Sequence, residues 1–201
     1  RFILIGDHKQ LPAVVVQDGE SSSVKDENLR NLGINDTRIS LFERLYMQVR
    51  QNDWTDAYGI LEQQGRMHEN LMTFVNTHFY EGKLQILPGL KRQTMDYFLK
   101  DEKYGNLNHR MVYIPSAVDE DINWKTNKNE AEIVTKTISD LLQMFASNDK
   151  VITHESIGII TPYRAQIALI RKYMEVLPKE LAAKITVDTV ERYQGGARDI
   201  I

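Results

Sequence analysis

The chain has 201 residues, of which 42% are hydrophobic and 26% are charged, and these proportions are ordinary for a soluble globular protein. No apolar run approaches the roughly 20 residues of a membrane span, so no membrane partner is expected. The absence of cysteine excludes disulfides and thiolate metal sites, and it fits a reducing, cytoplasmic location. A net charge of −3 argues mildly against a dedicated nucleic-acid-binding domain, although a basic groove can lie on an acidic protein.

The first third of the chain alternates between apolar and polar segments. Residues 2–5 form a continuous apolar run that ends in Gly6-Asp7, which predicts a strand of a parallel sheet buried on both faces. Residues 17–37 are polar and predict a surface loop. Ser40 precedes helically spaced apolar residues and a Glu three positions further on, which predicts a helix capped by Ser40.

The rest of the chain alternates between helical and strand patterns. The expected elements are a helix at 69–80, a loop at 87–108, a strand at 111–114, a helix at 129–145, a strand at 157–160, a helix ending near 177 and a strand at 185–187. This alternation predicts an α/β fold with parallel strands. Ligands bind such sheets at the carboxyl ends of the strands, where Gly6-Asp7, Thr161-Pro162 and Asp188-Thr189 are expected.

Two motifs carry groups that suit phosphate. Gln10, just beyond the first expected strand, can donate its amide to a phosphate or orient a water, and the alternative is a polar turn in which Asp7 caps local backbone. Arg66, at a helix start, can reach a phosphate with its planar fork, and the alternative is a surface ion pair. His68 has no second His at ligand spacing, so a local hydrogen-bonding role is expected rather than a metal site.

Two later motifs suit a nucleic-acid strand. Thr161, Tyr163 and Arg164 follow one expected strand, and Thr189 follows another. Hydroxyls and backbone amides at strand ends are natural contacts for a phosphate backbone, and aromatic rings there can stack on bases. Considered singly, Tyr163 and Tyr193 are expected as half-buried packing residues.

Together the motifs closely resemble the superfamily 1 helicases of the group that includes the nonsense-mediated-decay RNA helicase and the Okazaki-fragment nuclease–helicase. The resemblance covers nearly the whole chain and keeps the order of the family's motifs. The matching segments are Gly6-Asp7-His8-Lys9-Gln10-Leu11-Pro12 (motif III), Ser40-Leu41-Phe42-Glu43-Arg44-Leu45, Gln64-Gly65-Arg66-Met67-His68, Phe79-Tyr80-Glu81-Gly82-Lys83-Leu84, Thr161-Pro162-Tyr163 and Thr189 to Asp199 (motif V).

The resemblance implies a RecA-like fold of the P-loop NTPase type, with a parallel sheet and flanking helices. Residues 1–50 would end a first RecA-like domain, and residues 51–201 would form a second one that lacks its C-terminal end. The chain would then be an internal piece of an ATP-driven helicase or translocase, inactive alone. Its partners would be single-stranded DNA or RNA and the missing N-terminal RecA-like domain.

Residue roles carry over by match to the family's motifs. Gln10 and Arg66 would be catalytic, as a γ-phosphate sensor and an arginine finger. ATP would be bound by Gly6, Asp7, Gln10, Gln64, Arg66, Gln194 and Gly195, and nucleic acid by Pro12, Thr161, Tyr163, Arg164 and Thr189. The phosphate-binding loop and the Mg²⁺ ligands of the family would lie before Arg1, so no metal site is expected in this chain.

Two departures from the family keep alternatives open. Gly65 stands where the family has Tyr, and Ala197 stands where it has Glu, so both losses fall on the nucleoside side of the site. A helicase-like module that binds nucleic acid or a partner without ATPase activity is therefore one alternative. An ATPase switch of the same fold without a nucleic-acid substrate is another, and the net charge of −3 would suit it.

Overall fold

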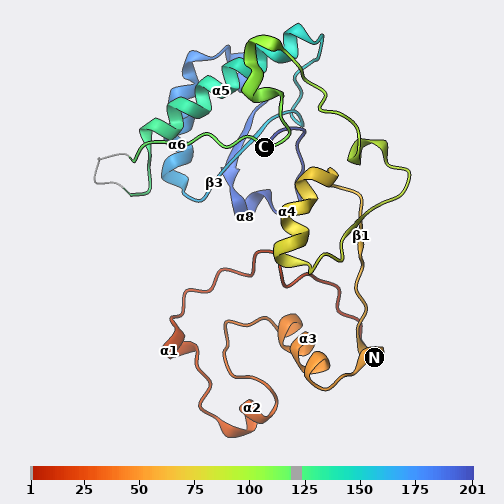
Figure 1. The fold of residues 1–201 in the computed structure, drawn as a ribbon. Helices are drawn as coiled ribbons and strands as arrows, with labels where there is room; N and C mark the ends of the chain where they lie inside the picture. The colour runs from red at the N-terminus through yellow and green to blue at the C-terminus, as the bar shows by residue number, and fades with distance from the viewer. Residues whose placement is uncertain (1, 119–123) are drawn as a thin grey trace. The chain divides into compact units, whose positions relative to one another are not determined.

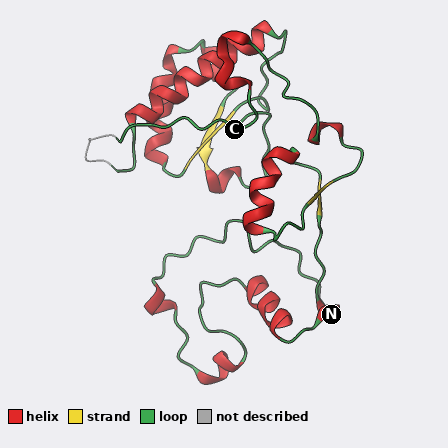
Figure 2. Ribbon diagram, viewed as in Figure 1, coloured by secondary structure: helices red, strands yellow, loops and turns green. Residues whose placement is uncertain are grey.

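A computed structural model describes residues 2–118 and 124–201 of the chain (Figure 1). The chain divides into two compact units. Unit 1 comprises Arg1–Met67 and Met72–Leu90, and unit 2 comprises His68–Leu71 and Lys91–Ile201. Parallel strands with flanking helices occur as the alternating pattern predicted, so the α/β fold class is confirmed (Figure 2).

Unit 1 is built from short elements and long connections. Its elements are α1 (Gly19–Ser22), α2 (Glu27–Asn31), α3 (Leu41–Gln51), the 3-10 helix η1 (Thr55–Ala57), β1 (Gln63–Gln64) and β2 (Gln85–Ile86), and α4 (Glu69–Phe79) is divided between the two units. Strands β1 and β2 are parallel partners. The cap predicted for α3 is confirmed, because the Ser40 hydroxyl accepts a 3.1 Å bond from the Glu43 amide.

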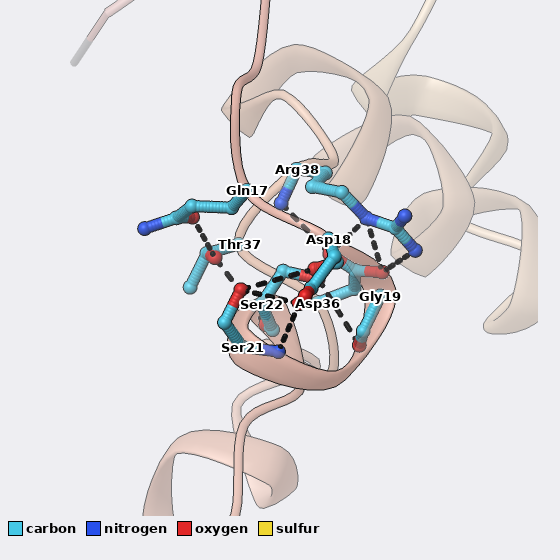
Figure 3. Close-up of polar contacts among 8 residues, drawn as sticks. All are labelled: Gln17, Asp18, Gly19, Ser21, Ser22, Asp36, Thr37 and Arg38. Carbon is cyan, nitrogen blue, oxygen red and sulfur yellow. Dashed lines mark hydrogen bonds and ion pairs between the residues drawn. The ribbon is translucent and has the colours of Figure 1, made fainter.

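The segment predicted as a polar loop contains two short helices. Side-chain hydrogen bonds and an ion pair connect residues along it (Figure 3). Asp18 caps α1 by accepting 2.7 Å and 2.6 Å bonds from the Ser21 amide and hydroxyl. The guanidinium of Arg38 lies 2.6 Å from Asp36 and, through its hydrogen bonds, lowers the pKa of that carboxyl to about 2. Side-chain bonds of this kind let a polar segment adopt a defined conformation without a large apolar core.

Two predicted strands are wrong. Residues 2–5 have no regular secondary structure and pair with no strand in the described part of the chain, and Ile3 and Ile5 are about nine-tenths exposed, at 88% and 91%. Residues 111–114 are likewise exposed and belong to no sheet in the part of the chain that the structure describes. A strand needs partners to satisfy its backbone groups, and an apolar run alone does not supply them. Gly6-Asp7 therefore does not follow a strand here.

Unit 2 holds the other predicted strands and the longest helix. Strands β3 (Gly158–Thr161) and β4 (Thr186–Thr189) are parallel, and their register pairs Gly158 with Thr186 and Thr161 with Thr189. A parallel bridge joins Ile157 to Ile200. The remaining elements are η2 (Lys91–Gln93), η3 (Glu102–Asn108), α5 (Lys128–Ser147), α6 (Arg164–Tyr173), η4 (Met174–Val176), α7 (Lys179–Ala182) and α8 (Val190–Tyr193).

The core of unit 2 lies where α5 and α6 pack together and α6 contacts both strands. The face predicted for the long helix is confirmed at Ile138, Leu141 and Phe145, all of which are buried. Helix α6 adds Ile170 and β4 adds Val187. The sheet edge that carries Thr161 and Thr189 is thereby held on a packed scaffold.

Candidate functional site

Asp7 organises the loop that contains the predicted phosphate sensor. Its carboxylate accepts a 3.0 Å bond from the Lys9 amide, a 2.9 Å bond from the Gln10 side-chain amide and a 2.6 Å bond from the Tyr80 hydroxyl. Gly6 lies against the ring of Phe42, because a Cβ added at Gly6 would stand 3.3 Å from Cδ2 of that ring. The alternative role proposed for Asp7, local capping of backbone, is thus present, and Gln10 is exposed and held by the same carboxylate.

The hydrogen bonds to Asp7 outweigh its partial burial. Burial alone would raise the pKa of the carboxyl, but the bonds from Tyr80, Gln10 and the Lys9 amide bring it below its ordinary value of 3.8. Burial and the bond to Asp7 raise the pKa of Tyr80 to about 12. Sequence reasoning missed Tyr80, although its block was noted, because nothing local links residues 73 positions apart.

Replacing Tyr80 with Phe is expected to lower the free energy of unfolding by about 0.5–1.5 kcal/mol at neutral pH, because the lost bond goes to a partly solvated carboxylate. The folded-state pKa of Asp7 lies below 3.8, so this contribution is full above that value and is lost as pH falls through the folded-state pKa. Denaturant titrations near pH 7 and at about pH 2 measure it. An equal difference between the two proteins at both pH values would contradict the assignment.

Gln64 shapes the turn that presents Arg66. Its side-chain oxygen accepts bonds of 2.9 Å and 2.7 Å from the amides of Arg66 and Met67, and its nitrogen donates a 2.9 Å bond to the Met67 carbonyl. The Arg66 side chain is exposed, and no ion pair of Arg66 is found among residues 2–118 and 124–201. Gln64 is therefore a positioning residue whose three bonds fix the backbone beneath an available guanidinium.

His68 has the local role that its isolation in the sequence predicted. It is buried, its Nδ1 accepts a 3.1 Å bond from the Asn70 amide, and its Nε2 consequently donates to the Met95 carbonyl at 3.1 Å. Gly65 faces two leucines, because a Cβ there would lie 3.0 Å from a methyl of Leu90 and 3.5 Å from one of Leu87. A larger side chain at Gly65 would have to displace the flexible tip of Leu90.

The strand-end residues lie together on unit 2. Thr161 and Thr189 are register partners at the ends of β3 and β4, while Tyr163 and Arg164 begin α6 and are exposed. Thr161 does not lie on the surface, as the nucleic-acid contact expected of it would require, because this residue is only 7% exposed on a strand contacted by α6 and α8. Thr189 is half-buried, so Tyr163, Arg164 and Thr189 carry the accessible polar and aromatic groups of this edge.

An acid accompanies these residues. The pKa of Glu191 is lowered first by its own backbone amide, then by a hydrogen bond from the Thr189 side chain, and also by the charge of Arg164. Glu191 is exposed and begins, with Val190, the short helix α8. A phosphate that approached Thr189 and Arg164 would compete with this carboxylate.

The last motif combines a packing residue with an exposed turn. Tyr193 is buried, as its packing role predicted, and its hydroxyl donates a 3.4 Å bond to the Thr186 carbonyl. Gly158 leaves room for this ring, because a Cβ there would lie 2.8 Å from Tyr193 Cζ. Gln194 and Gly195 follow on the surface, and Gly195 has a φ of +84°, which favours glycine.

The structure distributes the predicted site residues over both units. Gly6, Asp7, Gln10, Pro12, Gln64 and Arg66 belong to unit 1, whereas Thr161, Tyr163, Arg164, Thr189, Gln194 and Gly195 belong to unit 2. Within the described ranges, no three His, Asp or Glu side chains gather as a metal site would require. Nor does any helix in those ranges combine the length and apolarity that crossing a membrane demands.

Comparison with known proteins identifies the family. A family model described as "AAA domain" matches residues 37–201. The human 3'-5' exoribonuclease HELZ2 is 30% identical over 201 residues, which cover 97% of this chain and 6% of that protein. The ATP-dependent helicase NAM7 of Saccharomyces cerevisiae is 30% identical over 217 residues, covering 100% of the chain and 19% of the relative.

A third relative is the DNA replication ATP-dependent helicase/nuclease DNA2 of Gallus gallus, 31% identical over 208 residues that cover 100% of the chain and 16% of that protein. The chain therefore spans less than a fifth of the length of these curated relatives. The matches confirm the resemblance drawn from the motifs. Since the family model covers most of the chain, the protein belongs to the AAA-domain family, within the group of superfamily 1 helicases that these relatives represent.

Proposed function

We propose that this chain serves an ATP-dependent superfamily 1 helicase or translocase that moves along single-stranded nucleic acid in the cytoplasm. Residues 1–50 would end the first RecA-like domain and residues 51–201 would form most of the second. The observation that carries the proposal is the exposure of Gln10 and Arg66 in a chain of this family. The side chain of Gln10 is bonded to Asp7, and the backbone amide of Arg66 is bonded to the side chain of Gln64.

The donors in unit 1 fit the phosphates of ATP. The side-chain amide of Gln10 and the guanidinium fork of Arg66 offer N–H groups, and Arg binds planar or tetrahedral oxyanions through several bonds at once. Gln64 and Asp7 would position them, and Gly6 would add a backbone contact. When bound, ATP would supply the transferable phosphoryl group, with Mg²⁺ held by residues outside this chain.

The strand would lie against Tyr163, Arg164 and Thr189 of unit 2, with Thr161 beneath them. A guanidinium and a hydroxyl contact phosphates without reading sequence, which suits a motor that must pass every base. The relatives' names include an exoribonuclease and a DNA replication enzyme, so both DNA and RNA are proposed as substrates.

The test replaces Arg164 with Gln. Affinity for single-stranded oligonucleotides should fall by similar factors for all sequences, and the slope of log affinity against log salt should become shallower by about 1, because one phosphate contact is lost. Replacing Glu191 with Gln should instead raise affinity, since it removes a competing carboxylate. Fluorescence anisotropy across a salt series measures both effects.

The control for this test is Lys172, an exposed cation at the opposite end of the same helix. Lys172→Gln changes the net charge by the same amount as Arg164→Gln but should leave the salt slope nearly unchanged. Equal effects of the two substitutions would reduce the contact to long-range attraction and would overturn the assignment of this edge as the strand path.

A second function, a nucleic-acid-binding module without ATPase activity, is favoured by Gly65. The position carries no ring to stack on adenine and faces Leu87 and Leu90 instead. Nucleic-acid-stimulated ATP hydrolysis by the full-length protein separates the two functions. Measurable turnover supports the motor, whereas tight strand binding without turnover supports the module.

A further inference from the structure

Two aromatic rings meet on the surface beside the proposed strand path. Trp124 and Tyr163 stand edge to face, with ring centroids 5.6 Å apart and an interplanar angle of 84°. Trp124 is 74% exposed and Tyr163 is 37% exposed, so neither ring is a core residue. The ammonium of Lys125 lies 5.0 Å from the centre of the Trp124 ring. The pair therefore presents a large apolar face together with a cation.

The turn that carries Trp124 is fastened to the start of α6. Gln166, only 4% exposed, accepts a 2.8 Å bond from the Asn127 amide and donates a 3.0 Å bond to the Asn127 carbonyl. Asn127 in turn caps α5 by accepting a 3.0 Å bond from the Glu130 amide. These two bonds restrain the backbone three residues after Trp124. They thereby limit how far the ring can move from Tyr163.

An exposed indole held in place suits a planar ligand. Tryptophan buries more apolar area than any other side chain when a flat partner covers it, and a fixed ring loses little conformational entropy on binding. Single-stranded nucleic acid supplies such partners, because every base has a π face, and the adjacent cations Lys125 and Arg164 match its phosphates. Trp124 is 74% exposed beside Tyr163, so much of the indole remains accessible as a stacking surface.

We infer that Trp124 and Tyr163 form a base-stacking site for single-stranded nucleic acid, and that Gln166 positions it through Asn127. This inference rests on the proposed function and extends it, because the contacts at Arg164 and Thr189 address phosphates whereas this site addresses bases. Stacking of this kind accepts any base and therefore remains compatible with movement along a strand.

The experiment uses Trp124 as its own reporter. The chain has two tryptophans, so Trp54→Phe leaves Trp124 as the single indole. Oligo-dT and oligo-rU of about 15 nucleotides, a length that spans several bases, are compared with an abasic oligonucleotide of equal length. The base-containing strands should quench the fluorescence of Trp124 on binding, and the abasic strand should bind without quenching.

Affinity gives the second readout. In the same background, Trp124→Ala should weaken binding of the base-containing strands about 5- to 100-fold and leave binding of the abasic strand nearly unchanged. Trp124→Phe should restore part of the loss. Gln166→Ala should reduce the quenching amplitude, because the turn is then released. The control is Trp54→Ala in the otherwise unsubstituted chain, which removes another exposed indole, in unit 1, and should leave affinity unchanged.

The outcomes separate this inference from the function on which it rests. Saturable binding of all strands with no change in Trp124 fluorescence and no loss in Trp124→Ala would overturn the stacking site and leave the strand path intact. No binding of any strand by the unsubstituted chain would overturn both. Equal losses for abasic and base-containing strands would assign Trp124 to backbone packing or to a protein partner and would likewise overturn the site.

Discussion

Replacing Arg66 with Ala in the full-length protein is expected to lower the rate of ATP hydrolysis by about 10³- to 10⁵-fold, the range over which arginine fingers act in phosphoryl transfer. Negative charge that builds up on the phosphoryl oxygens in the transition state is stabilised by a guanidinium fork, and a small side chain cannot replace it. Affinity for single-stranded nucleic acid should change little. Steady-state ATPase assays with saturating oligonucleotide measure the effect.

Three controls accompany the Arg66 experiment. Lys at position 66 should recover little activity, because a point charge lacks the planar fork. Arg30→Ala removes another exposed arginine, from α2, and should leave hydrolysis unchanged. The melting temperature of Arg66→Ala should match that of the parent, since the side chain is exposed. Turnover near the parent value, or a loss of activity that follows a loss of folding, would refute the finger assignment.

Replacing Gly158 with Ala should lower the free energy of unfolding by about 1–3 kcal/mol, the usual cost of overpacking a well-packed core. The added Cβ would collide with the Tyr193 hydroxyl and would lie 2.8 Å from Tyr193 Cζ and 2.9 Å from Arg198 Cγ. Tyr193 would have to leave its place beside β3, and the last motif would lose its anchor. A urea unfolding titration, followed by a spectroscopic signal from unit 2, measures the change.

The matched control for Gly158 is Gly105→Ala, because a Cβ at Gly105 would meet no atom within 4 Å. Tyr193→Phe removes the atom that clashes most and should restore part of the stability lost in Gly158→Ala, giving a favourable coupling energy in a double-mutant cycle. An unfolding free energy unchanged by Gly158→Ala, or coupling of zero between the two sites, would contradict the role of Gly158 as the space for this ring.

Local signals in the sequence predicted local structure well. The Ser40 cap, the apolar face of α5 and the strands at Gly158 and Thr186 all follow from patterns within a few residues, because capping and amphipathic spacing are set by near neighbours. The apolar runs at residues 2–5 and 111–114 have the same local signal, but a strand also requires a partner that sequence spacing does not reveal.

Contacts between distant residues could not be predicted from one sequence. The bond from Tyr80 to Asp7 and the bonds between Gln166 and Asn127 join positions 73 and 39 residues apart. Burial of Thr161 depends on helices that fold over its strand, which a strand-end argument leaves out. Motif order therefore identified the family and the candidate residues, whereas their accessibility and positioning required the three-dimensional arrangement.

The bond between Gln10 and Asp7 has a thermodynamic consequence for any anion that would use Gln10. The N–H that makes this bond is available only in the molecules in which the bond is open, so for an anion that needs this N–H the apparent affinity equals the intrinsic affinity multiplied by the open fraction. A bond worth about 1.4 kcal/mol leaves roughly one molecule in ten open and weakens the apparent affinity about tenfold. Asp7 thus favours ligands that make several contacts. A weakly held anion does not displace the bond between Asp7 and Gln10, whereas a ligand with further contacts elsewhere does.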